Sequence, residues 1–277
     1  MRNLQIEKIV EVLNQSRALL VITGAGCSTA SGIADYRDQQ GAWKQAPPMQ
    51  HQDFMASHQA RQRYWARSQL GFPVFNRAQP NDAHNLLVSW EKNTRLIGLI
   101  TQNVDGLHQA AGHQNVIDLH GQLRRVVCMH CGAYETREKI QEYLDRHNTP
   151  VAGEVFALAD GDANVTATDF SKVQVPSCAR CGGILKPDVV FFGDSVDKNI
   201  VDQAYDWVDR ADVVLTVGTS LMVYSSFRFV RRAHARGIPI VSINLGVTRA
   251  DELLYAKAQG PCDQVLMEID GLLTQTD

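Results

Sequence analysis

The sequence lacks an excess of positive charge and has no long hydrophobic run. Its 277 residues include 27 Lys and Arg and 30 Asp and Glu, so the formal net charge of −3 does not favour nucleic-acid binding. No apolar stretch approaches the ~20 residues that a membrane-spanning helix needs. The N-terminal segment MRNLQIEKIVEVLNQ has helical periodicity and acidic residues, without the apolar centre of a secretory signal. We therefore expect a cytoplasmic protein that binds neither nucleic acid nor membrane.

Cysteine is also scarce, and its placement is informative. Four of the six cysteines form two pairs, Cys128-x-x-Cys131 and Cys178-x-x-Cys181, whereas Cys27 and Cys262 stand alone and are expected to be small buried residues. In a cytoplasmic chain of this size such pairs indicate a metal site, in preference to disulfides or a redox pair. Four thiolates complete a tetrahedral shell with no open coordination position, which predicts one structural zinc ion.

Internal repeats are absent, and the apolar residues instead alternate between helical and strand periodicity. Hydrophobic residues make up 44% and charged residues 21% of the chain, as in ordinary globular proteins. Helices are predicted at 1–15, 83–92 and 227–236, with another beginning near Ser28–Ser31, and strands at 18–22, 95–101, 213–217 and 238–243. This alternation predicts an α/β fold, a Rossmann-like parallel sheet with helices on both faces.

Two segments interrupt the alternation. Residues 38–82 contain four prolines and a helical run from about Asp53 to Leu70, which predicts a helical lid between long loops. Residues 122–187 contain both cysteine pairs and a polar stretch, Thr149–Thr168, which predicts an inserted zinc-binding module. The remaining segments are assigned to the Rossmann-like domain, namely 1–37, 83–121 and 188–277.

A glycine loop follows the first predicted strand. Gly24-Ala25-Gly26 would let backbone N–H groups approach a phosphate, and Arg37 could pair with the same group. Such a loop is also common as a simple tight turn. The full Gly-x-Gly-x-x-Gly pattern of dehydrogenases is absent, so hydride transfer is disfavoured.

Proton-transferring side chains follow the strand at 95–101. Asn103, Asp105 and His108 come directly after it, and His120 follows a few residues later. Polar groups where a strand ends indicate chemistry at the edge of an α/β sheet. A capped loop with a solvated histidine is the alternative. Short polar or glycine residues at 218–220, 244–246 and 262–263 also lie at predicted strand ends, where they suit a bound nucleotide or form ordinary turns.

Taken together, these segments resemble the sirtuin family of NAD-dependent protein deacylases. The matching segments occur in the family's order over nearly the whole chain: GAGCSTASGIADYR (24–37), TQNVDGLH (101–108), LHG (119–121), both cysteine pairs, KPDVVFFGD (186–194), VGTSL (217–221) and SINLG (242–246). The class II sirtuins are the most similar, through RQRYWAR (61–67), QVPSC (174–178) and the long segment between the cysteine pairs.

The resemblance implies an activity. It is that of an NAD-dependent protein-lysine deacylase, of the deacetylase or delipoylase type, which acts on acylated lysine side chains of proteins. The products would be nicotinamide, the deacylated lysine and O-acyl-ADP-ribose. The alternatives are a protein mono-ADP-ribosyltransferase that uses the same NAD site, and a non-catalytic module that binds NAD or acyl-lysine. A monomer is favoured.

The resemblance also implies residue roles. It makes His120 the general base, which removes a proton from a ribose hydroxyl, and it adds Asn103 as the second catalytic position. The implied NAD-binding residues are Gly24, Ala25, Gly26, Asp35, Tyr36, Arg37, Gln102, Asn103, Asp105, Gly218, Thr219, Ser220, Asn244, Leu245, Gly246 and Cys262. His108 receives no such role and is expected to be structural. Ala34 and Tyr36 stand where the family commonly has Pro and Phe, so we expect altered nicotinamide exchange.

The substrate side is implied in the same way. Val190, Phe191, Phe192 and Gly193 match the strip that lines the acyl channel and pairs with the substrate backbone. Tyr64-x-x-Arg67 resembles the pair with which desuccinylating sirtuins hold an acidic acyl group. Because i and i+3 residues share one helical face, an arginine fork could meet a carboxylate there. The alternative is that both side chains simply pack along the helix.

Overall fold

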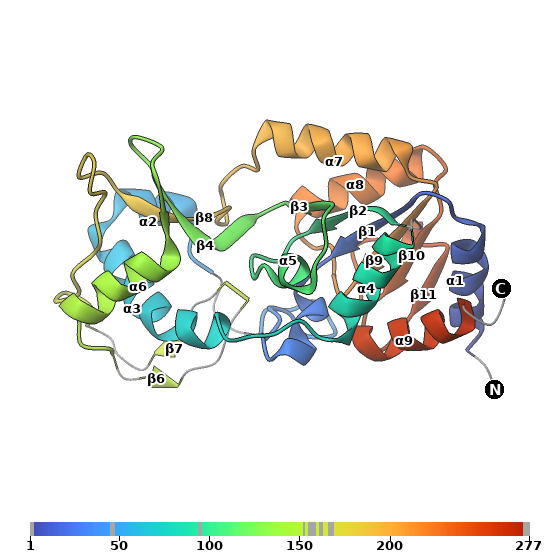
Figure 1. The fold of residues 1–277 in the computed structure, drawn as a ribbon, viewed down its shortest axis with the longest axis horizontal. Coiled ribbons are helices and arrows are strands. Elements are labelled where there is room, and N and C mark those ends of the chain that lie inside the picture. Colours follow the sequence, from blue (N-terminus) through green and yellow to red (C-terminus); the bar gives the residue numbers. More distant parts are fainter. Residues whose placement is uncertain are drawn as a thin grey trace.

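The computed structural model describes residues 3–44, 48–93, 96–151, 153–154, 159–160, 163–165 and 169–273 (Figure 1). Arg95, the first residue of one expected strand, lies outside these ranges, as do parts of the polar stretch Thr149–Thr168. Within the described residues, no helix combines the length and apolar character needed to cross a membrane.

The larger part of the molecule is built on a sheet of six parallel strands, which confirms the predicted α/β architecture. Their order is β11-β10-β9-β1-β2-β3, so the chain winds outward from β1 in both directions. The strands are β1 (Leu19–Thr23), β2 (Leu96–Thr101), β3 (Val116–Asp118), β9 (Val213–Val217), β10 (Ile240–Ile243) and β11 (Ala256–Ala258). The order reverses between β1 and β9, which is where doubly wound sheets bind their ligands.

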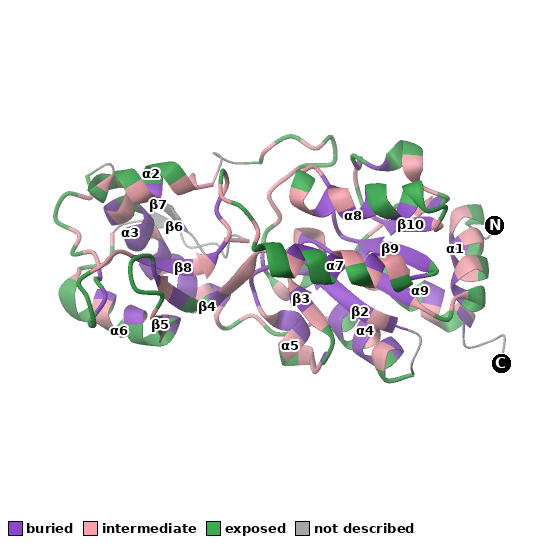
Figure 2. Ribbon diagram, turned by 90° about the horizontal axis from the view of Figure 1, so that it is seen from above, coloured by how far each residue is buried: buried purple, intermediate pink, exposed green. Residues whose placement is uncertain are grey.

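Helices cover both faces of this sheet, as Figures 1 and 2 show. One face packs against α1 (Leu4–Gln15), α4 (Asp82–Lys92) and α9 (Cys262–Leu273), and the other against α7 (Lys198–Arg210) and α8 (Tyr224–Ala235). Along β1, Leu19 and Val21 point into the first layer and Leu20 and Ile22 into the second. Burial on both faces explains why this strand is a continuous apolar run. The short α5 (Leu107–Ala111) follows β2.

A second body lies at the other end of the molecule (Figure 1). It contains an antiparallel sheet of order β5-β4-β8 and, within the described residues, a two-stranded pair. The elements are α2 (His51–Ala56), α3 (His58–Phe75), β4 (Gly121–Cys128), β5 (Tyr134–Thr136), α6 (Arg137–His147), β6 (Gly153–Glu154), β7 (Asn164–Val165) and β8 (Leu185–Val189). Phe54, Trp65, Val126, Leu144 and Leu185 share one buried core. The helices of segment 38–82 therefore pack into the same body as the cysteine-bearing strands.

Two local predictions are wrong. The helix expected near Ser28 is instead a pair of 3₁₀ turns, η1 (Ala25–Cys27) and η2 (Thr29–Ser31), because the chain turns away at Gly32, where φ is +82°. The helix expected from Asp53 to Leu70 is interrupted at Ser57. That residue has an extended backbone, and its hydroxyl accepts a hydrogen bond from the Ala60 N–H at 3.2 Å, which starts α3 as a separate helix.

Candidate active site

A cavity of about 1180 Å³ opens where the parallel strands end. The loops after β1, β2, β9 and β10 contribute to its wall, together with the end of β8 and the chain that follows it. It brings together all the predicted NAD-binding residues except Asp105, along with His120 and the strip Val190–Gly193. Of the described residues predicted to contact substrate, Tyr64 and Arg67 do not line it.

The glycines let two loops meet at the centre of the cavity. The Gly24 N–H donates to the Val217 carbonyl at 3.1 Å, and the Gly26 N–H donates to the Gly218 carbonyl at 2.9 Å. A Cβ on Gly26 would lie 2.9 Å from that carbonyl oxygen, and one on Gly218, where φ is +60°, would lie 2.3 Å from the Cys27 nitrogen. Because neither loop can accept a side chain, the glycines allow the closest approach of the two strand ends.

Asn103 and Asp105 are joined through Ser28. The Asn103 amide donates to the Gly24 carbonyl and to Ser28 Oγ, both at 3.0 Å, and Ser28 Oγ donates to Asp105 Oδ2 at 2.7 Å. Burial raises the pKa of Asp105, and the hydrogen bonds from Leu107 N–H and Ser28 oppose that shift. Asp105 therefore lies behind the wall and acts on Ser28, which the sequence suggested only as a helix start and not as a site residue.

His120 is held by hydrogen bonds on both ring nitrogens. Nδ1 lies 3.0 Å from the Gln102 carbonyl, which can only accept, so Nδ1 carries the proton. Nε2 lies 2.8 Å from Ser225 Oγ, which therefore donates to it. Burial lowers the pKa of His120 to about 4, while the bond to Gln102 acts in the opposite direction. The ring is thus neutral at pH 7 with its basic lone pair on Nε2, and the sequence reasoning missed Ser225, its partner.

Trp43 joins Tyr36, which is predicted to bind NAD, to Phe192 in the strip predicted to contact substrate. The Arg37 guanidinium lies 3.9 Å from the centroid of the Trp43 ring and donates to the Gly41 carbonyl at 2.7 Å. Trp43 also makes edge-to-face contacts with Tyr36 and Phe192, at centroid distances of 6.0 and 5.5 Å. Trp43 was not predicted as a site residue. Asp35, beside Tyr36 in the sequence, pairs with Lys44.

The substrate strip is anchored by its backbone. The Val190 N–H donates to the His120 carbonyl, and the His51 N–H donates to the Phe192 carbonyl, each at 2.8 Å. Tyr64 is buried behind Phe191, with ring centroids 5.4 Å apart. Arg67 Nε donates to the Ala163 carbonyl at 3.0 Å. The strip thus faces the cavity, Tyr64 packs against it from behind, and Arg67 does not line the cavity.

At the other end of the cavity lie the residues predicted for the adenosine half of NAD. Gly218, Thr219 and Ser220 follow β9, and the Thr219 hydroxyl accepts from the Gln102 amide at 2.9 Å. The Asn244 amide donates to the Gly246 carbonyl at 2.9 Å, which shapes the loop after β10. Cys262 is buried at the start of α9. The strand ends thus supply polar and backbone groups in the pattern that suits a nucleotide.

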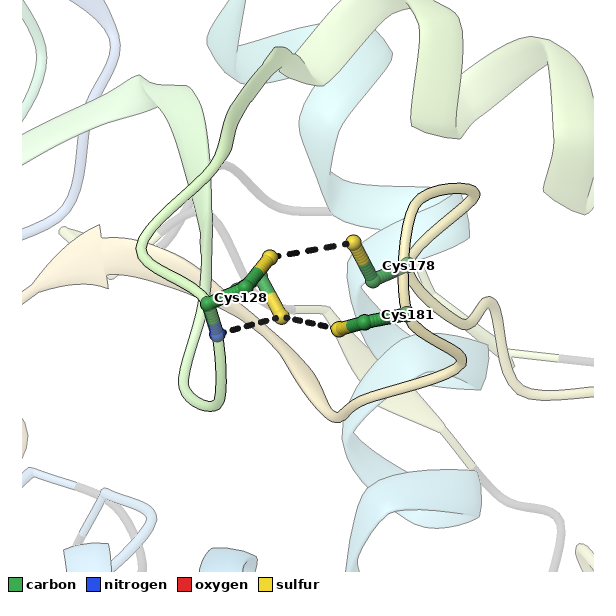
Figure 3. Close-up of side chains that lie close together, drawn as sticks. Cys128, Cys178 and Cys181 are labelled. Atoms are coloured by element: carbon green, nitrogen blue, oxygen red, sulfur yellow. Dashed lines mark hydrogen bonds between the residues drawn. The ribbon is translucent and has the colours of Figure 1, made fainter.

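The four paired cysteines form a separate cluster, shown in Figure 3. Cys128 Sγ lies 3.6 Å from Cys181 Sγ, and Cys131 Sγ lies 3.7 Å from Cys178 Sγ. The edge of a tetrahedron with Zn–S bonds of about 2.3 Å is about 3.8 Å, so the four thiols fit one zinc ion. None of the four lines the cavity. The prediction of a structural, non-catalytic zinc site is therefore supported by geometry.

Comparison with known proteins agrees with the family resemblance found in the sequence. The model of the Sir2 family matches residues 24–225. "NAD-dependent protein deacetylase 2" of Bradyrhizobium diazoefficiens is 51% identical over 261 residues, covering 94% of this chain and 96% of that protein. "NAD-dependent protein lipoamidase sirtuin-4, mitochondrial" of Bos taurus is 45% identical over 270 residues, covering 96% and 86%. The solved structure "Sir2-p53 peptide-NAD+" superposes with a TM-score of 0.78 at 26% identity, covering 100% and 99%.

Proposed function

Because this chain belongs to the Sir2 family, the sirtuins, and is an NAD-dependent protein deacetylase, we propose how its residues divide the reaction. Gly24, Ala25 and Gly26, with Arg37, bind the pyrophosphate of NAD. Residues 218–220 and 244–246, with Cys262, bind the adenosine half. NAD, when bound, would supply a ribose carbon that bonds to the acyl oxygen while its bond to nicotinamide breaks. The single observation that carries this proposal is the convergence of these residues with His120 on one cavity.

We assign the proton transfer to His120. Its Nε2 lone pair faces Ser225 in the free protein, so a ribose hydroxyl would take the place of that serine as the hydrogen-bond donor. Asn103 orients the nicotinamide ribose, and Asp105 holds the loop through Ser28 so that the nicotinamide carboxamide is gripped. His120 Nε2 takes the proton, so the hydroxyl becomes a nucleophile toward the acyl carbon. With one water consumed and the lysine amine released, O-acyl-ADP-ribose is the expected product.

We further propose that the preferred acyl group is apolar, extending from acetyl to longer chains such as lipoyl. Three of the four strip residues are Val190, Phe191 and Phe192, and the cavity wall beside them includes Val104 and Met49. The bovine relative's name, lipoamidase, favours the same range. Arg67, the cation predicted to hold an acidic acyl group, does not line the cavity, and its Nε donates to the Ala163 carbonyl instead.

The test is an NAD-dependent assay on acetyl-, lipoyl-, long-chain and succinyl-lysine peptides, with product masses. Apolar acyl-lysines should be cleaved to O-acyl-ADP-ribose, and His120→Gln should reduce turnover by at least about 10²-fold. The exposed His234→Gln is the matched control. A modified acceptor protein in place of O-acyl-ADP-ribose would identify an ADP-ribosyltransferase. Full turnover by His120→Gln would refute the assigned base, and NAD binding without any turnover would indicate a binding module.

The role of Tyr64 and Arg67 has its own test. Arg67→Met should leave apolar acyl turnover nearly unchanged, as should Arg63→Met, which alters an exposed arginine on the same helix. If succinyl-lysine is a good substrate and Arg67→Met alone abolishes its turnover, the protein prefers acidic acyl groups and the proposed apolar preference is wrong. We also propose a monomer in the cytoplasm, which light scattering and cell fractionation would check.

A further inference from the structure

Three buried histidines lie beneath the active site with nitrogens that lack a hydrogen-bond partner among the residues that the structure describes. These atoms are His84 Nε2, His108 Nδ1 and His113 Nε2. All three side chains are nearly inaccessible, with relative exposures of 0%, 1% and 4%. The rings are neighbours, since the centroids of His84 and His108 lie 4.8 Å apart and those of His108 and His113 lie 5.3 Å apart. Unpaired buried polar atoms are costly, so this cluster requires an explanation.

In each ring, the hydrogen bond made by one nitrogen shows whether the unpaired nitrogen is a donor or an acceptor. The Asn81 N–H donates to His84 Nδ1 at 3.3 Å, so the proton of the neutral ring lies on Nε2. His113 Nδ1 lies 2.7 Å from a carboxylate oxygen of Glu91, to which it donates, so its Nε2 has the lone pair. Burial lowers the pKa of each of these histidines, to about 4 for His84, which keeps the rings neutral at pH 7.

The protonated nitrogen of His108 is assigned from its contact with Thr23. Its Nε2 lies 2.9 Å from Thr23 Oγ1, and that hydroxyl donates its own proton to Thr101 Oγ1 at 2.9 Å. Nε2 must therefore donate to Thr23, and Nδ1 has the lone pair. The cluster as a whole thus presents one donor, on His84, and two acceptors, on His108 and His113. A water molecule, with two O–H donors and an accepting oxygen, is complementary to that set.

The same chain of hydrogen bonds continues to the backbone of Asn103. Thr101 Oγ1, which accepts from Thr23, also accepts from the backbone N–H of Asn103 at 3.1 Å. The Asn103 side chain then reaches Gly24 and Ser28 at the cavity wall. We propose that the three imidazoles hold one internal water molecule, and that His108, through Thr23 and Thr101, is a positioning residue for Asn103. The kinetic part of this inference rests on the proposed role of Asn103.

Thr23 provides the sharpest kinetic test, because Thr23→Val keeps the shape and removes the hydroxyl, whereas Thr23→Ser keeps the hydroxyl. Thr23→Val should lower kcat/KM for NAD roughly tenfold, since a severed hydrogen bond leaves Asn103 less well held, and Thr23→Ser should stay within about twofold. Thr216→Val is the matched control. Thr216 is equally buried on β9, and its hydroxyl has no partner among the described side chains. Wild-type kcat/KM in a folded Thr23→Val protein would overturn the positioning role.

The water site is tested without activity, so its failure differs from a failure of the proposed function. Nitrogen-15 spectra of the histidine rings should show the proton on Nε2 of His84 and His108 and on Nδ1 of His113. A high-resolution crystal structure should show one water within hydrogen-bonding distance of the three remaining nitrogens. Any other set of protonated nitrogens would overturn the assignment. So would a second metal ion per chain that Cys27→Ala removes, because Cys27, His84 and His108 have potential ligand atoms within 4.8 Å of one another.

Discussion

At the scale of single residues, the proposed chemistry depends on which nitrogen of His120 carries the proton. The Gln102 carbonyl holds the proton on Nδ1, and Ser225 donates to Nε2. The hydrogen bond from Ser225 stabilises the neutral ring and therefore acts in the same direction as burial, which lowers the pKa of His120 to about 4. A base with such a pKa is unprotonated throughout the neutral range.

Removal of the Ser225 hydroxyl should make His120 easier to protonate. In Ser225→Ala the neutral ring loses a hydrogen bond, so the pKa of His120 should rise by up to about one unit. The acid limb of kcat/KM, which reports protonation of the free base, should move to higher pH by the same amount. Ser89→Ala, on the exposed side of α4, is the control. The same acid limb in both variants would argue against the assigned bond.

At the scale of elements, the decisive feature is the contact between the loop after β1 and the loop after β9. Each strand, with its alternating burial into two helical layers, was predictable because apolar periodicity is a local property. The predictions at 213–217 and 83–92 are confirmed to within a residue by β9 and α4. The contact between the loops was not predictable, because it joins residues nearly two hundred positions apart.

Adding one methyl group at this contact should weaken NAD binding. In Gly26→Ala the new Cβ would lie 2.9 Å from the Gly218 carbonyl oxygen and 3.0 Å from its Cα, so the two loops must separate. We expect KM for NAD to rise about tenfold, because a strained close contact of this kind costs 1–3 kcal/mol. Gly271→Ala in α9, where a Cβ meets nothing within 4 Å, should leave KM unchanged. Equal KM values in the two variants would contradict the packing argument.

At the scale of the whole molecule, the zinc cluster and the substrate strip share one hydrophobic core. Cys128 and Cys178 belong to the same buried cluster as Phe54, Tyr64 and Phe191. Phe191 also faces the cavity. The zinc ion is not expected to take part in the reaction, but it should stabilise one wall of the cavity.

Zinc removal should consequently reduce activity before the large sheet unfolds. A chelator should lower turnover and change the fluorescence of Trp65. The far-ultraviolet circular dichroism should retain most of its signal, because the six-stranded sheet has its own core. Cys178→Ser should behave in the same way, and Cys27→Ser should retain its zinc. Full activity in a chain from which zinc has been removed, as measured by metal analysis, would contradict this coupling.

The buried histidines should make the folded state sensitive to acid. The pKa of His84 is lowered from 6.5 to about 4 by burial, so its neutral form favours folding above pH 6.5 and that stability is lost as pH falls toward 4. The free energy of unfolding should fall by about 1.4 kcal/mol per pH unit in this window through His84. Urea titrations at pH 7 and 5 would measure the slope. His84→Gln should reduce it, and the exposed His147→Gln should not.

The sequence by itself determined the alternation of helices and strands and the four zinc ligands, and its resemblance to a known family pointed to many of the residues that line the cavity. The helices and strands follow from local periodicity, and the zinc ligands follow from the short Cys-x-x-Cys spacings. The cavity residues follow from polar groups placed where strands end and from the resemblance of their motifs to the sirtuins. Only the tertiary structure decided that Asp105 acts through Ser28, that Ser225 caps His120, that Tyr64 packs against Phe191, and that Arg67 does not line the cavity. Those arrangements depend on side chains that meet from distant segments, and no local pattern encodes which of them will touch.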